Sequence, residues 1–336
     1  MIFVSRTVNF GLWYDFRNPG AELSFEKLYR GCLDQIVWAE SIGFNSVWLT
    51  EHHFIADGYS PSPLVLAAAI GERTKSMRIG TNLMLLTLAD PLRLAEDASA
   101  LAILTEGRFD LGVGLGYRQL EFDYFGRSVK QRPSLMEEGV AILRQAFTGE
   151  PVNHKGKRYE IEGLAIQPTA VKPPRILMGG MAPPAIERAA RLGDGFLSTG
   201  GIGHDEYVAS LKETGRPGAI FAGHWGIIAA DPEREAAHVG PYALYQTNEY
   251  IRWGAFGPPD ETPVFEDGAS AIEGGLYELH DGASAVASLT EMLLKYPEIE
   301  DVHFWAQFPG ESIESGSARL EYIANDVLPE VRRNIA

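Results

Sequence analysis

A short polar segment directly follows an apolar run near the start of the chain. Residues 50–54, TEHHF, come after FNSVWL, a run that predicts a buried strand. Two imidazoles and a carboxylate in this position could bind a metal, act as an acid/base pair, or form a polar surface patch. On an extended strand Glu51 and His53 face one way and His52 the other, so the three side chains cannot all reach one metal.

The acid/base interpretation is the one that this cluster favours. The remaining histidines are scattered, and none forms an H-x-H or H-x-x-x-H pair, so we expect no metal site. A neutral imidazole at the end of a strand is a natural general base near pH 7. The alternative is a pair of histidines that bond to neighbouring loops and have no catalytic role.

A glycine-rich run, GVGLG at 112–116, could be taken for a nucleotide-binding loop. The pattern G-x-G-x-x-G fails because residue 117 is tyrosine, and the run lies on a fourth strand instead of in a first βα turn. Gly114 and Gly116 remove side chains where the strand ends, which permits a ring or another backbone segment to approach closely. Tight packing alone explains the same glycines.

A second glycine turn, in MGGMAPPAIERAA at 178–190, is a better candidate for binding an anion. A strand ends in two glycines and a helix begins with two prolines, which lack N–H groups. The backbone N–H groups of Gly180, Met181 and Ala182 could therefore bind a phosphate at the helix N-terminus. The alternative is an ordinary βα turn.

Asn82, a polar residue within the run GTNLMLL, is interpreted by itself as a strand-end cap.

Apolar strand-like runs alternate with amphipathic helix-like runs along the chain. The strand-like runs are apolar throughout, which is typical of parallel strands that are buried on both faces. We therefore predict an α/β fold, a (β/α)8 TIM barrel with its active site at the carboxyl ends of the strands, and a doubly wound sheet is the competing fold. The eight predicted strands are residues 7–16, 46–53, 78–86, 108–116, 175–180, 195–200, 219–230 and 301–308.

The rhythm of strands and helices breaks in two places. Residues 150–174 predict a hairpin-bearing insertion, and residues 254–282 form a long connection rich in glycine and proline. Phe256, Phe265 and Tyr277 lie in this connection, which we interpret as a mobile lid over an apolar substrate. We predict one domain over residues 1–336.

Composition limits the classes of function. The 336 residues include 29 basic and 45 acidic side chains, a net charge of -16, which argues against nucleic acid and anionic membranes as partners. The first residues do not resemble a signal peptide, and no apolar run is long enough to span a membrane. Cys32 is the only cysteine, so an intramolecular disulfide is excluded. We expect a cytoplasmic protein.

Together the motifs resemble those of the bacterial luciferase-like monooxygenase family. The resemblance covers residues 7 to 200 approximately, and the motifs stand in the family's order. They are EHHF at 51–54, RIGTNLMLL at 78–86 followed by DPLRLAEDASAL at 90–101, EGRFDLGVGLGYRQLEFDYFG at 106–126, and LMGGMAPPAIERAARLGDGF at 177–196.

The resemblance implies a site for FMN or the deazaflavin F420, with His52 as the catalytic base and with Glu51 and His53 supporting or orienting it. It also implies a non-proline cis peptide bond between Asn82 and Leu83, held against one face of the flavin ring. The segment after the fourth strand and the turn at 179–182 would hold the ribityl phosphate. The cofactor-binding residues implied in this way are Asn82, Leu83, Gly114, Leu115, Gly116, Tyr117, Gly179, Gly180, Met181 and Ala182.

The sequence departs from the family pattern at several positions. Gly114 stands where bacterial luciferase has a reactive cysteine, and Ala102 replaces a common aspartate. Met181 and Ala182 replace a polar pair near the phosphate, which implies weak binding of oxidised flavin. Such weak binding suits a two-component monooxygenase that receives reduced FMN from a separate flavin reductase.

The resemblance leaves three functions open. The first is a monooxygenase that uses reduced FMN and O2 on a small, largely apolar substrate, with His52 as general base. The second is an F420-dependent oxidoreductase that transfers hydride, and the third is a flavin-binding protein without catalytic activity. A homodimer or a higher homo-oligomer is the expected assembly.

Overall fold

The structure is a computed structural model that describes residues 7–21 and 23–336, and the side chains of all of these except 275 and 276. Eight parallel strands follow one another around a closed barrel, because β3 pairs with β5 as well as with β2. The predicted (β/α)8 barrel is therefore confirmed. The barrel strands are β1 (Asn9–Tyr14), β2 (Ser46–Leu49), β3 (Arg78–Thr81), β5 (Phe109–Gly114), β8 (Ile176–Gly179), β9 (Gly195–Thr199), β10 (Ala219–His224) and β13 (Ile299–Trp305).

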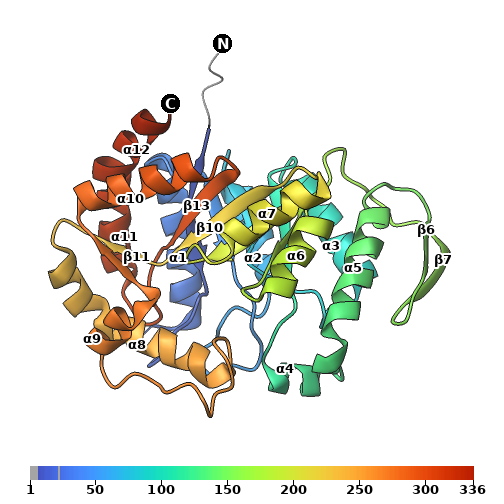
Figure 1. Ribbon diagram of the computed structural model, residues 1–336, viewed down its shortest axis with the longest axis horizontal. Helices are drawn as coiled ribbons and strands as arrows, with labels where there is room; N and C mark the ends of the chain where they lie inside the picture. The colour runs from blue at the N-terminus through green and yellow to red at the C-terminus, as the bar shows by residue number, and fades with distance from the viewer. Residues whose placement is uncertain (1–6, 22) are drawn as a thin grey trace.

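Helices surround the strands, as Figure 1 shows. Helix α1 begins where Ser24 accepts a hydrogen bond from the N–H of Lys27, and α3 begins where Asp90 accepts two such bonds ahead of Pro91. The helices are α1 (Phe25–Ser41), α2 (Pro63–Arg73), α3 (Pro91–Leu104), α4 (Gln119–Tyr124), α5 (Arg132–Ala146), α6 (Pro183–Leu192), α7 (His204–Thr214), α8 (Pro232–Trp253), α9 (Gly268–Ala271), α10 (Gly282–Lys295), α11 (Ile313–Tyr322) and α12 (Leu328–Ile335).

The apolar core has two layers, one on each face of the barrel strands. Along β1, Phe10 and Leu12 belong to the layer between strands and helices, whereas Trp13 belongs to a second cluster with Trp48 and Trp305. Successive side chains of a strand point to opposite faces, so the second cluster fills the barrel interior. The barrel is therefore a packed core that can position side chains at its rim.

Ion pairs join neighbouring strands at the amino end of the barrel. The buried carboxylate of Asp110, at the start of β5, lies 2.6 Å from Nη2 of Arg78 on β3 and 2.9 Å from Nη2 of Arg175 ahead of β8. These ion pairs thus join three strands at the end of the barrel opposite to the expected site. Residues at this end of such a barrel contribute to its stability.

Several predicted strands are shorter than expected. The second ends at Leu49, so residues 50–53 lie in a loop, and the third is interrupted by a cis peptide bond between Asn82 and Leu83 before β4 (Met84–Leu85). The resemblance implied this cis bond. The seventh ends at His224, and its continuation β11 (Gly226–Ile228) leaves the barrel to pair with β12 (Glu278–His280).

Two segments depart from the repeating βα pattern. Residues 150–174 contain the antiparallel hairpin of β6 (Val152–Lys155) and β7 (Glu160–Leu164), which projects beyond α5 in Figure 1. Residues 254–282 contain α9, a π-helical turn over 272–276 and β12, so this connection is more ordered than its composition indicated. None of the helices within the described residues is long and apolar enough to cross a membrane.

Candidate functional site

A cavity of about 440 Å³ opens at the carboxyl ends of the barrel strands. The loops after β2, β3, β5 and β8 supply most of its wall, which is where active sites of this fold are found. All the residues that the sequence analysis assigned to the site border this cavity, except His53. The tertiary structure thus brings the separate motifs together.

His52 lies in a short chain of hydrogen bonds. Its Nδ1 is 2.8 Å from Oε1 of Glu121, and its Nε2 is 3.0 Å from the hydroxyl oxygen of Tyr117. The same Glu121 oxygen accepts a 2.8 Å hydrogen bond from the backbone N–H of His53. His52 is 5% exposed and Glu121 is fully buried, so these bonds hold the imidazole in one orientation.

The side chains of Glu51 and His53, the two neighbours of His52, make hydrogen bonds of their own. Glu51 accepts a hydrogen bond from the backbone N–H of Leu85, and its other oxygen lies 3.2 Å from Nε2 of His53. Neither side chain bonds to the imidazole of His52. Glu51 holds β4 in place, and the carboxylate that orients His52 is Glu121.

Glu121 was not identified from the sequence. It lies on α4, inside the motif at 106–126, but nothing in one sequence separates it from Asp123, the other acidic residue of that helix. Only the fold, which brings α4 against the loop after β2, singles it out.

Glycines at two strand ends accommodate the side chain of Leu83. A Cβ added to Gly114 would lie 2.4 Å from Leu83, and one added to Gly179 would lie 2.6 Å from it. The carbonyl of the cis peptide before Leu83 accepts a 3.3 Å hydrogen bond from Trp13 Nε1. The close approach predicted at Gly114 is therefore an approach by this leucine.

Asn82 does not act as a strand-end cap, and this interpretation was wrong. Its side-chain amide lies 2.9 Å from Nε2 of His303 inside the barrel, and Nδ1 of His303 lies 2.9 Å from Asp301. All three side chains are buried. The polar amide is thus part of a hydrogen-bonded network in the core, where an unpaired polar group would be costly.

One end of the cavity can bind an anion. Helix α6 begins after Ala182, and none of the described side chains caps its N-terminus. The turn at 179–182 borders the cavity. Arg132 borders it as well, held by hydrogen bonds from Nη1 to the Gly116 carbonyl at 2.6 Å and from Nε to the Val129 carbonyl. Burial lowers the pKa of Arg132, although a guanidinium keeps its charge in proteins.

Aromatic side chains form much of the remaining wall. Trp13, Tyr59, Trp225, Tyr250 and Phe256 border the cavity, and the hydroxyls of Tyr59 and Tyr250 are 3.0 Å apart. Burial raises the pKa of both tyrosines, so they stay neutral. Sequence reasoning found neither Arg132 nor this wall, apart from Phe256, because these residues come from distant segments that only the fold joins.

A second cavity of about 330 Å³ adjoins the first. Met181, Thr199, Trp225 and Phe256 border both cavities. The second is also bordered by His204, which donates or accepts a 2.7 Å hydrogen bond with Ser198 and whose pKa is lowered by burial to about 4. Together the two cavities form a site with an apolar centre and several separate polar groups.

The sequence is similar to that of enzymes that use F420. It is 31% identical over 200 residues to an F420-dependent glucose-6-phosphate dehydrogenase of Amycolatopsis mediterranei, a match that covers 57% of this chain and 60% of that protein. Across the curated relatives of this kind, the chain spans at most about 60% of their length.

Solved structures of monooxygenases have the same fold. A monooxygenase from Streptomyces bottropensis superposes with a TM-score of 0.80 at 22% identity, covering 96% of this chain and 99% of that one. The oxygenating constituent of 3,6-diketocamphane monooxygenase from Pseudomonas putida, solved with FMN, gives a TM-score of 0.77 at 20% identity and covers 96% and 98%.

The family is shown by a match to most of the chain. The sequence profile of the luciferase-like monooxygenases matches residues 8–262, a range that contains every predicted site residue. This range also includes the cis peptide after Asn82, the His52 cluster and the turn before α6. The chain belongs to the luciferase-like monooxygenase family, which supports an enzyme of the oxidoreductase class.

Proposed function

We propose that this protein is a flavin-dependent monooxygenase that uses reduced FMN and O2 on a small, largely apolar organic substrate. The observation that carries the proposal is the hydrogen-bonded chain of Glu121, His52 and Tyr117, which ends at an aromatic cavity. A cavity of this kind excludes water from reactive species while the polar chain moves a proton.

The residues around the cavity fit a flavin with a terminal phosphate. Arg132 and the backbone of residues 179–182 would hold the phosphate, because a guanidinium and a helix N-terminus are both anion-binding groups. Leu83 and the backbone before it would lie against the ring system. When bound, the flavin supplies the redox chemistry with oxygen, and the protein supplies position and protons.

His52 is proposed to exchange its proton at Nε2. Oε1 of Glu121 accepts a hydrogen bond from the His53 N–H and also faces Nδ1 of His52. Because a carboxylate can only accept, the ring proton of neutral His52 lies on Nδ1. Burial raises the pKa of Tyr117 well above its usual value, so its hydroxyl keeps its proton and donates it toward Nε2. Tyr117 borders the cavity, so its hydroxyl would pass protons between the cavity and His52.

The cofactor is tested by anaerobic titration of the purified protein with reduced FMN and, separately, with reduced F420. We expect reduced FMN to bind more tightly, and the bound form to react with admitted O2 at a rate that differs from that of free reduced FMN. Absorbance follows both steps. Preference for reduced F420, with no change in its reaction with O2, would contradict the proposal.

The F420-dependent oxidoreductase is the second candidate, because named relatives at 31% identity use F420. In that case His52 would give or take a proton while hydride moves between F420 and the substrate. A flavin-binding protein without activity is the third, and the buried relay of Glu121, His52 and Tyr117 argues against it, because binding alone does not require a proton relay at the cavity.

Replacing His52 by glutamine should separate cofactor binding from chemistry. We expect the Kd for reduced FMN to stay within about threefold of the wild type, because His52 belongs to the proton relay and not to the anion-binding end. Product formation from a panel of small aldehydes and ketones should fall by about 10²- to 10⁴-fold, the usual contribution of a general acid or base. The exposed histidine His238 supplies the control, H238Q, and full activity of H52Q would refute the assignment.

Replacing Glu121 by alanine should destabilise the fold and slow the reaction. The change leaves Nδ1 of His52 and the N–H of His53 without their acceptor, and each unpaired buried group costs about 1–3 kcal/mol. Urea unfolding measures the loss of stability. Glu121→Gln keeps an acceptor oxygen, so it should recover most of the stability but little of the rate, and equal stability of wild type and E121A would contradict this geometry.

The lid predicted over residues 254–282 is proposed to be limited to its first part. The backbone N–H and carbonyl of Phe265 bond to the side chain of Asn248 at 2.8 and 2.9 Å, and β12 is paired with β11. Ala255 and Phe256 border the main cavity, so the segment 254–264 is the part that can close it.

Shortening the segment 257–263 to a glycine-serine linker tests this lid. The fold should survive, because Asn248 and β12 hold the residues that follow. The fraction of consumed O2 released as hydrogen peroxide should rise severalfold, since water then reaches the reactive species. An oxygen electrode and a peroxide assay measure the ratio, and an unchanged ratio would eliminate the lid.

The partners and the cellular location follow from the proposed chemistry. Met181 and Ala182 offer only backbone groups to the phosphate, which supports loose binding of flavin and delivery by a separate flavin reductase. A homodimer or higher homo-oligomer is proposed from the general prevalence of closed symmetric assemblies. A cytoplasmic location is proposed because reduced flavin is supplied there, and the net charge of -16 argues against binding to nucleic acid or membranes.

A further inference from the structure

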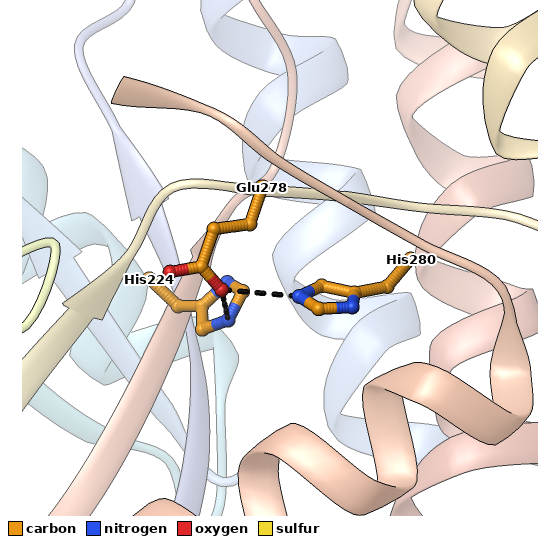
Figure 2. A group of neighbouring side chains, drawn as sticks. All are labelled: His224, Glu278 and His280. Carbon is orange, nitrogen blue, oxygen red and sulfur yellow. Dashed lines mark hydrogen bonds and ion pairs between the residues drawn. The ribbon is translucent and has the colours of Figure 1, made fainter. Parts of the chain in front are cut away.

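Three side chains meet at the mouth of the second cavity, away from the His52 relay. His224 Nε2 lies 3.8 Å from Oε2 of Glu278, and His280 Nε2 lies 3.0 Å from the same oxygen. Figure 2 shows both imidazole rings directed at this carboxylate. We propose that His224, Glu278 and His280 bind a divalent transition-metal ion of the zinc type, with the cavity facing its remaining coordination position.

Two elements position these ligands. His224 is the last residue of β10, and Glu278 and His280 are the first and last residues of β12. Residues two apart on a strand point to the same face, so Glu278 and His280 project together. The parallel pairing of β11 with β12 aligns Gly226 with Glu278, which fixes the register between the two histidines.

The position of His224 depends on a glycine. A Cβ added to Gly226 would lie 2.2 Å from Cε1 and 2.5 Å from Nδ1 of the His224 ring, so only glycine leaves room for this ring. The ring is nine-tenths buried, and its Nδ1 has no hydrogen-bond partner within the part of the chain that the structure describes. A buried imidazole nitrogen without a hydrogen-bond partner is unusual and calls for an explanation.

The arrangement matches the donor set and spacing of a metal site. Two imidazole nitrogens and one carboxylate oxygen are a common set for catalytic zinc and for non-haem iron. Ligand bonds near 2.0–2.1 Å in a tetrahedral site place the donor atoms about 3.3 Å apart. The three donor atoms here lie within 4.8 Å of one another, so small side-chain rotations suffice.

A cavity gives the ion an open coordination position. His224 and Glu278 border the second cavity, which shares Trp225 and Phe256 with the proposed flavin site. A site with three protein ligands keeps one position for water or for a ligand oxygen. The ion would also join β12 to the barrel strand β10, and so would stabilise the connection that follows the proposed lid.

This proposal departs from the expectation drawn from the sequence. The histidines are separated by 56 residues and form no recognised spacing, which is why the sequence indicated no metal site. Strand β11 follows β10 directly and pairs with β12 outside the barrel, and this pairing places β12 next to the end of β10. The proposal does not depend on the proposed oxygenase function, since it rests on different residues.

Metal binding to the full-length chain tests the proposal. The purified protein is stripped with a chelator, dialysed, and titrated with Zn²⁺ by calorimetry and with Co²⁺ by visible absorption. We expect one equivalent per chain, a four- or five-coordinate Co²⁺ spectrum, and a rise in Tm on adding Zn²⁺, because a ligand that binds only the native state stabilises it.

Variants locate the site. Glu278→Gln removes the charge of a largely exposed side chain, so it should fold normally and weaken Zn²⁺ binding by at least about tenfold. His280→Ala should do the same, and the double variant H224A/H280A should abolish the Co²⁺ spectrum. H238A, at an exposed histidine elsewhere, and H52A should both retain the single equivalent.

The outcomes are distinct. Absence of a bound equivalent in the wild type overturns the proposal, as does binding that survives in H224A/H280A. Binding that is lost in H52A but kept in H280A would assign the ion to the other histidine cluster, and so would also overturn it. Circular dichroism and thermal unfolding of each variant show whether a loss of binding comes from misfolding. If a histidine variant fails to fold, the Zn²⁺ affinity of E278Q decides whether the ion binds at this cluster.

Discussion

Closure of the barrel between β3 and β5 is the constraint on which the site depends. Ile79 pairs with Phe109 and Gly80 with Asp110, and the Thr81 hydroxyl bonds to both backbone groups of Gly112 at 2.7 and 2.9 Å. This pairing leaves the barrel strands without a free edge and sends every carboxyl end to one rim. The contact is close, since a Cβ added to Gly112 would lie 1.9 Å from the Thr81 carbonyl oxygen.

Because the rim collects loops from all strands, one buried carboxylate can connect two of them. Glu121 follows β5, and it bonds to the side chain of His52 and the backbone of His53 after β2. Asn82 after β3 reaches His303 on β13 across the interior. These two contacts join polar side chains over long sequence distances, which rigidifies the rim.

The rim is not symmetric around the barrel. After β10 the chain leaves the barrel as β11, pairs with β12, and extends the wall beyond Trp225. Glu278 on β12 borders the second cavity, and Trp225 and Phe256 border both cavities. The barrel strands therefore position the proposed flavin site, while the pairing of β11 with β12 outside the barrel creates the His224, Glu278 and His280 cluster.

The sequence by itself determined the barrel, the order of its strands and the motifs at their ends, because uniformly apolar strands, helix caps and glycine turns are local signals. It also placed the cis peptide after Asn82 through the family resemblance. Only the tertiary structure decided that Glu121 orients His52, that Asn82 points into the core, and that His224 meets His280. The physical reason is that these contacts join residues between 56 and 221 positions apart, and no local pattern specifies which polar groups will meet once the barrel closes.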